Sequence, residues 1–361
     1  MEKFKSFITE ETKPYDLLVI SHDGIDDVNE TGPLLIKKAE KLGMKVFLAE
    51  TMGSYIEETS NGKFFYSYKV DDKGVSKLPT SKEKVDYEKP FKISPEKTLI
   101  MMRGLHPKFG CESWNVMARN LEHDGYKLIN SVKCNEICND KWYNQIMFQR
   151  NNIPTPKTVL IRHSEDASRT AEKLDNKYPM ILKTSIGSTG VGVMFVESEK
   201  ALTGIVQLLY REDKYIDVLL QEYIKTDYDV RAIVVNGKVL GSMKRPIVDG
   251  DFRSNVSQGS QPQIHELTEL EETETLRAAE AVGGDVVGVD FIPAKNREKE
   301  KPLFIEVNSN PGLMGIEETL SKNNFSITTE ILKIYMNRDN WSWLWKINYG
   351  GVYSPLEQYW W

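Results

Sequence analysis

Two carboxylates and one amide fall on two strands that the sequence predicts near the end of the chain. Residues 285–292 (DVVGVDFI) and 302–308 (PLFIEVN) are apolar runs, and the charged, turn-like stretch between them indicates an antiparallel pair. Side chains two apart in a strand share a face, so Glu306 and Asn308 point the same way. Asp290 can join them from the partner strand. The pattern therefore predicts three oxygen-bearing side chains on one face of a sheet.

A divalent cation would fit this set of oxygens. Two converging carboxylates repel each other unless a cation lies between them. Mg²⁺ takes carboxylate and carbonyl oxygens, and it keeps coordination sites for waters and substrate phosphates. We therefore predict that Asp290, Glu306 and Asn308 hold Mg²⁺ or Mn²⁺, while Ile305 and Val307 point into a core. The alternative is that the two acids are surface residues paired with neighbouring lysines.

A glycine-rich segment, GSTGVG at 187–192, lies between two further strands predicted within residues 179–196. A P-loop or a dinucleotide fingerprint would need a helix after the glycines, so the segment is interpreted as a hairpin instead. Glycines let backbone N–H groups approach phosphate oxygens closely, which predicts a flap over a phosphate. The alternative is an ordinary tight β-turn.

Lys183 stands in the apolar strand that precedes this flap. Burial of an unpaired ammonium is costly, and a phosphate partner would relieve the cost, unless the side chain simply extends to solvent. Residues 218–224 (VLLQEYI) then predict a strand of the kind whose backbone hydrogen-bonds an adenine edge. Asp229 follows and could hold ribose hydroxyls, although neither assignment is specific by itself.

The composition describes a globular protein. With 361 residues, 40% of them hydrophobic and 28% charged, the chain is long enough for two or three domains. A net charge of −6 argues against direct nucleic-acid binding, and five scattered histidines support neither a zinc site nor a hydrolase triad. Three cysteines are too few for a disulfide framework. Without a signal-peptide core or a run of 18 apolar residues, we expect a soluble cytoplasmic protein with no membrane partner.

The elements that would position these residues alternate between strands and helices. Residues 15–20 predict a strand, 31–43 a helix and 44–49 a second strand, an order that indicates a small parallel sheet. No Gly-x-Gly-x-x-Gly opens the helix, so a dinucleotide is not expected there. The remaining predictions are irregular hairpins or an insertion at 51–95, a strand at 98–103, helices at 111–124 and 136–151, and a boundary near 152–154.

The end of the chain is rich in tryptophan, with five of the seven at positions 341, 343, 345, 360 and 361. These rings either pack back on the body of the protein or form a docking surface for another subunit or partner. A homo-oligomer is therefore one of the arrangements that we consider.

Several of these features, taken in chain order, resemble the ATP-grasp ligases, and most closely the RimK family of ribosomal protein S6 glutamate ligase-like enzymes. The likeness covers about residues 130–335. The features that carry it are Lys141, Lys183, the glycine flap, Gln221-Glu222-Tyr223-Ile224, Asp229-Val230-Arg231, Gly250-Asp-Phe-Arg-Ser-Asn255, Asp290 and Glu306-Val307-Asn308.

The resemblance implies an α/β (α+β) protein with an ATP-grasp fold behind an amino-terminal Rossmann-like pre-ATP-grasp domain. The expected divisions are 1–130 for that domain with its insertion at 51–95, 131–220 for the central ATP-grasp subdomain, 221–335 for the carboxyl-terminal subdomain with the metal site, and 336–361 for the aromatic tail.

The resemblance also implies roles for individual residues. Lys141 and Lys183 would contact ATP phosphates beneath a flap that includes Gly187, Ser188, Thr189, Gly190 and Gly192. The nucleotide site would be completed by Gln221, Glu222, Tyr223 and Ile224 at the adenine, Asp229 at the ribose, and Arg253, Ser254 and Asn255. Asp290, Glu306 and Asn308 would hold two Mg²⁺ or Mn²⁺ ions, in agreement with the strand argument above.

The expected reaction follows from these parts. A carboxylate attacks the γ-phosphate of ATP to give an acyl phosphate and ADP, and an amine then displaces phosphate to form an amide. Guanidinium groups match planar oxyanions, so Arg231, Arg245 and Arg253 are the candidate catalytic residues. The alternative for Arg231 and Arg245 is a surface or structural ion pair. The flap has Ile186 where S6-ligase relatives often carry glutamate, and this difference leaves the choice of acceptor open.

The expected substrates are ATP, an amino acid such as glutamate, and a carboxylate acceptor such as a protein or peptide carboxyl terminus. Two other functions stay open at this point. One is an ATP-grasp kinase that phosphorylates a small molecule, since a fold does not fix a function. The other is a non-catalytic module that binds ATP and uses the aromatic tail to bind partners.

Overall fold

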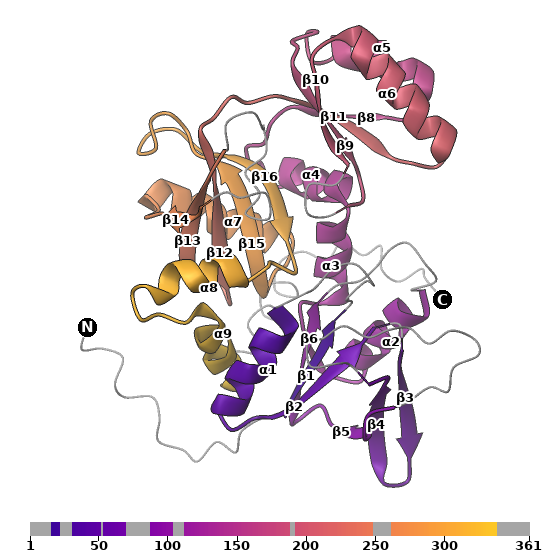
Figure 1. Ribbon diagram of the computed structural model, residues 1–361, viewed down its shortest axis with the longest axis vertical. Helices are drawn as coiled ribbons and strands as arrows, with labels where there is room; N and C mark the ends of the chain where they lie inside the picture. The colour runs from indigo at the N-terminus through magenta and orange to yellow at the C-terminus, as the bar shows by residue number, and fades with distance from the viewer. Residues whose placement is uncertain are drawn as a thin grey trace, which may run out of the picture.

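The structure is a computed structural model that describes residues 16–21, 31–51, 53–69, 87–103, 112–187, 192–247 and 261–337. Figure 1 shows three groups of elements, each built around its own sheet, with the central group projecting from the other two. Within the described part of the chain, no helix combines the length and the apolar character needed to cross a bilayer.

A four-stranded sheet in the order β2-β1-β6-β7 forms the amino-terminal group, and every pairing in it is parallel. The parallel sheet expected from the βαβ order is thus confirmed. Residues 17–20 are fully buried because helices cover both faces of a parallel sheet. The elements are β1 (Asp16–Ser21), α1 (Thr31–Lys41), β2 (Lys45–Glu50), β6 (Thr98–Arg103), α2 (Glu112–His123) and β7 (Lys127–Ile129).

The stretch predicted as hairpins or an insertion forms a small antiparallel sheet of β3 (Ser54–Thr59), β4 (Gly62–Ser67) and β5 (Phe91–Ile93). One face packs Phe65 and Phe91 against Phe47 of β2. The opposite face carries Tyr55 stacked on Tyr66, with 4.6 Å between ring centroids. Hairpins are therefore the correct description of this segment.

Two helices, not one, occupy the region predicted as a helix at 136–151. They are α3 (Val132–Asn139) and α4 (Lys141–Arg150), and the expected start at 136 was wrong. The helical backbone is interrupted at Asp140, which has an extended conformation. Its carboxylate accepts hydrogen bonds from the backbone amides of Trp142 and Tyr143. An aspartate at this position ends one helix because it caps the next.

The central group is an antiparallel sheet in the order β10-β9-β11-β8. A 3-10 turn at Ser164–Asp166, α5 (Ala167–Glu172) and α6 (Glu199–Glu212) cover one face, where Leu182 and Leu220 pack against Leu202. The other face is turned away from these helices. The strands are β8 (Thr158–Ile161), β9 (Met180–Thr184), β10 (Val193–Val196) and β11 (Val218–Glu222).

The third group is a five-stranded antiparallel sheet in the order β14-β13-β12-β15-β16. Its α7 packs Ala278 and Ala279 with the side chains of one sheet face, together with α3 and α4. The elements are β12 (Tyr228–Val235), β13 (Lys238–Pro246), β14 (Gln263–Ile264), α7 (Glu269–Ala281), β15 (Val286–Ile292), β16 (Leu303–Asn308), α8 (Met314–Ser321) and α9 (Ile327–Met336).

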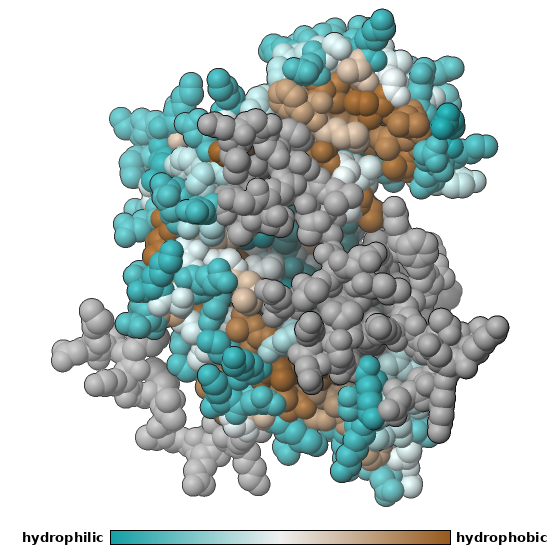
Figure 2. Space-filling model, in the orientation of Figure 1, coloured by the Kyte–Doolittle hydropathy of each residue, from teal (hydrophilic) through white to brown (hydrophobic). Residues whose placement is uncertain are grey.

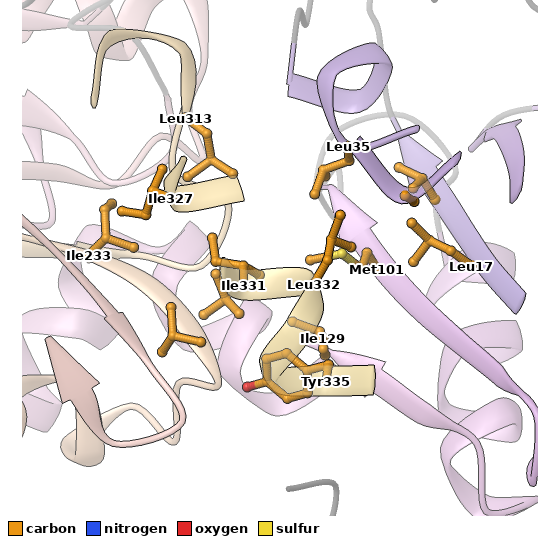
Figure 3. Close-up of a cluster of buried hydrophobic side chains, with 14 of the residues drawn as sticks. Leu17, Leu35, Met101, Ile129, Ile233, Leu313, Ile327, Ile331, Leu332 and Tyr335 are labelled. Carbon is orange, nitrogen blue, oxygen red and sulfur yellow. The ribbon is translucent and has the colours of Figure 1, made fainter. Parts of the chain in front are cut away.

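The amino-terminal and third groups share one hydrophobic core, drawn in Figure 3. Leu17 and Met101 from the parallel sheet and Leu35 from α1 lie on one side, while Ile233 of β12 and Ile331 of α9 lie on the other. The central group has a separate core of its own. The domain limits at 130, 220 and 335 stay predictions.

A β-bulge interrupts the pair β15–β16 between Asp290 and Phe291. Phe291 pairs with Phe304 instead of Ile305, so Phe304 is fully buried and Ile305 is only partly buried. The expectation that Ile305 points into the core was therefore wrong, because a bulge adds one residue and shifts the alternation of faces. Val307 is fully buried, as expected.

Candidate active site

The three predicted metal ligands lie on neighbouring positions of the third sheet. Asp290 pairs with Glu306 across the antiparallel strands β15 and β16, and Asn308 pairs with Gly288 two residues along. Paired residues share a face, so all three side chains lie on the same side. Asn308 donates a hydrogen bond from Nδ2 to Oε1 of Glu306 at 3.1 Å. The predicted antiparallel pair and the shared face are both confirmed.

Two arginines hold Asp290, so the structural pairing considered as an alternative for them is present, although the sequence argument had not named Asp290 as the partner. Arg231, its pair on β12, donates from Nε to Oδ1 at 2.7 Å and from Nη2 to Oδ2 at 2.6 Å. Arg245 donates to the same Oδ2 at 3.0 Å and also forks onto Asp229 at 2.7 and 2.6 Å. The charge of Asp290 is thus balanced by arginines, whereas Glu306 forms no ion pair within the described residues, and the metal assignment stays a prediction.

The ion pairs fix the charges of this cluster. Burial by itself raises the pKa of Asp290, but the charges and hydrogen bonds of Arg231 and Arg245 outweigh it and hold the pKa below the usual value. Burial lowers the pKa of Arg245, and the stronger attraction of Asp290 and Asp229 raises it above the ordinary value. These shifts favour the charged forms of Asp290 and Arg245.

The donor set still suits a hard cation. Among the described residues, no three His, Cys, Asp or Glu side chains come close enough to hold a metal by themselves, so the amide of Asn308 would be needed as a ligand. Carboxylate and amide oxygens are what Mg²⁺ prefers. The oxygens of Asp290, Glu306 and Asn308 fit Mg²⁺ or Mn²⁺ in kind, and their role as ligands stays a prediction.

Lys183 lies within electrostatic reach of this set, although it belongs to the central sheet. Burial lowers its pKa from 10.5 to about 8, the nearby Glu306 opposes that shift, and the charge of Lys141 adds to it. The three charged groups thus come from β9, β16 and the start of α4. Lys183 thus has one carboxylate and one ammonium in its surroundings, and the predicted role of the two lysines in binding phosphate stays a prediction.

Lys141 is held in place by contacts between α4 and the end of β9. Its backbone N–H donates to the carbonyl of Ser185 at 2.9 Å, and its ammonium donates to the carbonyl of Gly187. The hydroxyl of Ser185 donates to the carboxylate of Asp140, which also caps α4. The sequence analysis missed Asp140 and Ser185; the only signal was an aspartate immediately before a helix that begins with lysine.

The two strands on either side of the glycine flap pair with each other as a hairpin. β9 and β10 pair antiparallel from Val193 and Lys183 onward, which confirms the predicted strand–turn–strand order. Gly192 has a φ of +80°, and a Cβ there would lie 2.4 Å from the hydroxyl of Thr184, so only glycine fits. Ser188, Thr189 and Gly190 lie outside the described residues.

The residues predicted to line the adenine pocket lie on the central sheet and in the segment that follows β11. Register places Lys183, Leu219 and Gln221 on the face away from α5 and α6, and Figure 2 shows hydrophobic surface over this part of the molecule. Gln221 donates to the hydroxyl of Thr158 at 2.7 Å. The ring of Tyr223 stands edge-on to Phe195, which lies on the same face, with 5.0 Å between centroids.

The other predicted nucleotide contacts are placed less directly. Glu222 uses its carboxylate to accept from the backbone N–H of Lys157 at 2.7 Å. Ile224 and Tyr223 follow Glu222, the last residue of the β9–β11 ladder. Asp229, predicted to bind ribose, is buried in the ion pair with Arg245. Arg253, Ser254 and Asn255 lie outside the described residues, and these assignments stay predictions.

Comparisons with known proteins agree with this arrangement. Residues 138–334 match the family model described as the RimK-like ATP-grasp domain. A probable alpha-L-glutamate ligase of Stutzerimonas stutzeri (strain A1501) is 32% identical over 227 residues, which cover 62% of this chain and 72% of that protein.

Solved structures share the fold at lower identity. The D-alanine–D-alanine ligase of Bacillus anthracis, complexed with ATP, has a TM-score of 0.61 at 15% identity and covers 92% of this chain and 99% of its own. The ATP-grasp ligase PsnB, complexed with a phosphomimetic variant of a minimal precursor, Mg and ADP, has a TM-score of 0.60 at 14% identity, covering 91% and 99%. With the family-model match, these findings place the chain in the RimK-like ATP-grasp family of ATP-dependent ligases.

Proposed function

We propose that the protein uses ATP to join an amino acid such as glutamate to a carboxylate of a protein or peptide. The observation that carries the proposal is that Lys183 of the central sheet lies within electrostatic reach of both Glu306 on the third sheet and Lys141 at the start of α4. Phosphoryl transfer depends mainly on positioning and on neutralising phosphate charge. Lysines that face an acid able to hold a cation supply both.

The proposed reaction has two steps. The acceptor carboxylate attacks the γ-phosphorus of ATP, the bond to the β-phosphate oxygen breaks, and an acyl phosphate and ADP result. The amine of the incoming amino acid then attacks the acyl carbon, and the amide forms as inorganic phosphate leaves and the amine loses a proton. Bound Mg²⁺ would neutralise phosphate charge.

The residues of this chain would divide the work among them. Lys141 and Lys183 bind the phosphates, with the flap that starts at Gly187 above them. The Tyr223 ring and the face that carries Leu219 would contact the adenine. Asp290, Glu306 and Asn308 would hold the cation.

The two arginines would differ in their roles. Arg231 uses two of its five N–H groups on Asp290, so others remain for a substrate oxyanion. Arg245 is more deeply buried, with a side chain 4% exposed against 18% for Arg231, and it supports Asp229 and Asp290. Contact with substrate is therefore proposed for Arg231 and support for Arg245.

The choice of substrates is argued from relatives. The Stutzerimonas stutzeri protein is named a probable alpha-L-glutamate ligase, which supports glutamate as the amino acid. PsnB binds a precursor, which supports a peptide or protein as the acceptor. The amino-terminal parallel sheet shares one core with the third sheet through α1, α8 and α9, so the amino-terminal group would be able to contribute to acceptor choice.

The test is a product analysis by mass spectrometry. The full chain is incubated with ATP, Mg²⁺, each of a panel of amino acids, and peptides with free carboxyl termini. A mass gain equal to one amino acid residue, with ADP and orthophosphate released only when both substrates are present, is the expected result. A stable phosphorylated product would instead identify a kinase, and ATP binding without ADP formation for any pair would identify a non-catalytic module.

A further inference from the structure

We propose that Arg231 restricts Asp290 to a single oxygen for a divalent cation, so that the protein binds the cation weakly until nucleotide phosphates supply further ligands. This inference rests on the proposed function, because it assigns the order in which that site fills. Arg231 acts here as a positioning residue, since its effect on the cation passes through Asp290.

The first step is a count of lone pairs on Asp290. An ionised carboxylate offers about four acceptor sites, two on each oxygen. Oδ2 accepts from Nη2 of Arg231 at 2.6 Å and from Nη2 of Arg245 at 3.0 Å, so both of its sites are used. Within the described residues, Oδ1 accepts one hydrogen bond, from Nε of Arg231 at 2.7 Å. One acceptor site, on Oδ1, remains for a cation.

The second step is a count of charge. Among the described residues, Asp290 and Asp229 are matched by Arg231 and Arg245, so this cluster is neutral. A cation that approaches Asp290 therefore meets a guanidinium as well as a carboxylate. Glu306 is the remaining acid of the predicted ligand set, and the ammonium of Lys183 lies near it.

The third step is the fixed position of Arg231. It pairs with Asp290 at the centre of the sheet, between strands that are hydrogen-bonded on both sides. The side chain of Arg231 passes over Gly288. If residue 288 had a Cβ atom, that atom would lie 3.7 Å from Cδ and Nε of Arg231. Pro311 closes the other side of Gly288, at 2.9 Å from the same Cβ position. The guanidinium is thus held against Asp290 by the strands and by the space that glycine leaves.

A site with one carboxylate oxygen, one glutamate and one amide needs more oxygen ligands to bind Mg²⁺ tightly. Phosphate oxygens of a nucleotide held by Lys183 and Lys141 would supply them. Nucleotide and cation would therefore bind cooperatively, and free cation alone would bind weakly. Such coupling is reciprocal, so the cation would raise nucleotide affinity by the same factor.

The test is a titration of the full chain with Mn²⁺. Binding is measured from the electron paramagnetic resonance signal of the Mn²⁺ that stays free. Arg231→Met removes the competing guanidinium, and Mn²⁺ affinity without nucleotide should rise on the order of tenfold because Asp290 regains charge and acceptor sites. Addition of ADP should strengthen Mn²⁺ binding far more in the unaltered protein than in this variant. Unchanged or weaker binding of Mn²⁺ alone in Arg231→Met would overturn the proposal.

Two further variants keep the result interpretable. Arg231→Lys keeps the positive charge and loses the fork, so its Mn²⁺ affinity should rise only a few-fold; a fall would also overturn the proposal, even if Arg231→Met does not fold. Arg277→Met is the matched control, since that arginine pairs with Glu274 on α7 and should leave Mn²⁺ binding unchanged. The titration needs no turnover. A protein that is inactive in the ligase assay could therefore still show, or fail to show, the change in Mn²⁺ affinity, and the two failures are distinguishable.

Discussion

Lys183 and Glu306 belong to different sheets, yet the carboxylate of Glu306 acts on the pKa of Lys183. Burial has the larger effect and lowers this pKa to about 8, while the charge of Glu306 opposes the shift. This relationship ties the charge of a lysine that is predicted to bind phosphate to an acid of the predicted metal site. The charge of Lys183 therefore changes within the pH range in which enzymes are commonly assayed.

Nucleotide binding should weaken as the pH rises through about 8. Lys183 carries its charge below its lowered pKa of about 8 and loses it above, and a neutral amine attracts phosphate less. ADP affinity measured by calorimetry between pH 6.5 and 9.5, with a chelator present, should show this loss, and Lys183→Met should remove it. In Glu306→Gln the loss should move to lower pH, because the opposing charge is gone; a flat profile in the unaltered protein would contradict the assignment.

Glu306→Gln should abolish turnover and leave the fold intact. We expect product formation to fall by at least about 100-fold, because the cation loses its charged ligand on β16. The side chain is only partly buried, so the free energy of unfolding in urea should change by less than about 1 kcal/mol. Normal turnover in this variant would refute the metal assignment.

Asp290→Asn should behave differently, because Asp290 also belongs to the fold. A neutral amide would leave Arg231 and Arg245 facing one carboxylate in place of two, in a cluster where Asp290 is 3% exposed. Breaking a buried ion pair from one side costs about 3 kcal/mol or more. Urea unfolding should show this loss, and a stability equal to that of Glu306→Gln would contradict it.

Asp140 should affect nucleotide binding through its effect on the position of Lys141. Its carboxylate caps α4 and accepts the hydroxyl of Ser185, and these bonds hold Lys141 beside the flap. Asp140→Ala should raise the KM for ATP on the order of tenfold with a smaller change in kcat, besides a cap loss of about 1 kcal/mol. Asp140→Ser, which can still cap, should recover the stability; if KM follows stability alone, Asp140 has no positioning role.

The free energy of unfolding at acid pH should depend on Glu271, which is fully buried at the start of α7. Burial opposes its ionisation, but hydrogen bonds from Arg297, His265 and Thr268 lower its pKa from 4.5 to about 2. A lowered pKa stabilises the fold above 4.5, and this contribution is lost as the pH falls towards 2. Glu271→Gln should cost about 2 kcal/mol at pH 7 and much less near pH 2. An equal cost at both pH values would contradict this reasoning.

Local patterns in the sequence were sufficient for most strands of the site. The alternation of apolar and polar residues around Asp290 and Glu306 predicted the antiparallel pair and the shared face of their side chains, because strand geometry has a period of two. The bulge beside Asp290 was not predictable in this way. An inserted residue leaves the composition of a strand unchanged and shows only in the pairing, which is why Phe304 took the place expected for Ile305.

Contacts between distant segments account for the other differences. Arg231 and Asp290 are 59 positions apart, and Arg245 reaches Asp229 and Asp290 only because three strands pair in one register. No local pattern encodes such a pairing, so the arginines were assigned to substrate without their carboxylate partners. The helix break at Asp140 was a local signal, since aspartate before a helix is a common cap.

The shared core of Figure 3 has a consequence for movement within the protein. Because α9 and the amino-terminal strands are buried together, these two groups form one rigid base, while β8–β11 with α5 and α6 close around a core of their own. The central group joins that base through the irregular segments 151–157 and 223–227. If the central group moves relative to that base, we expect the change in backbone angles to fall in these two segments, and such a movement would change the distance between Lys183 and Glu306.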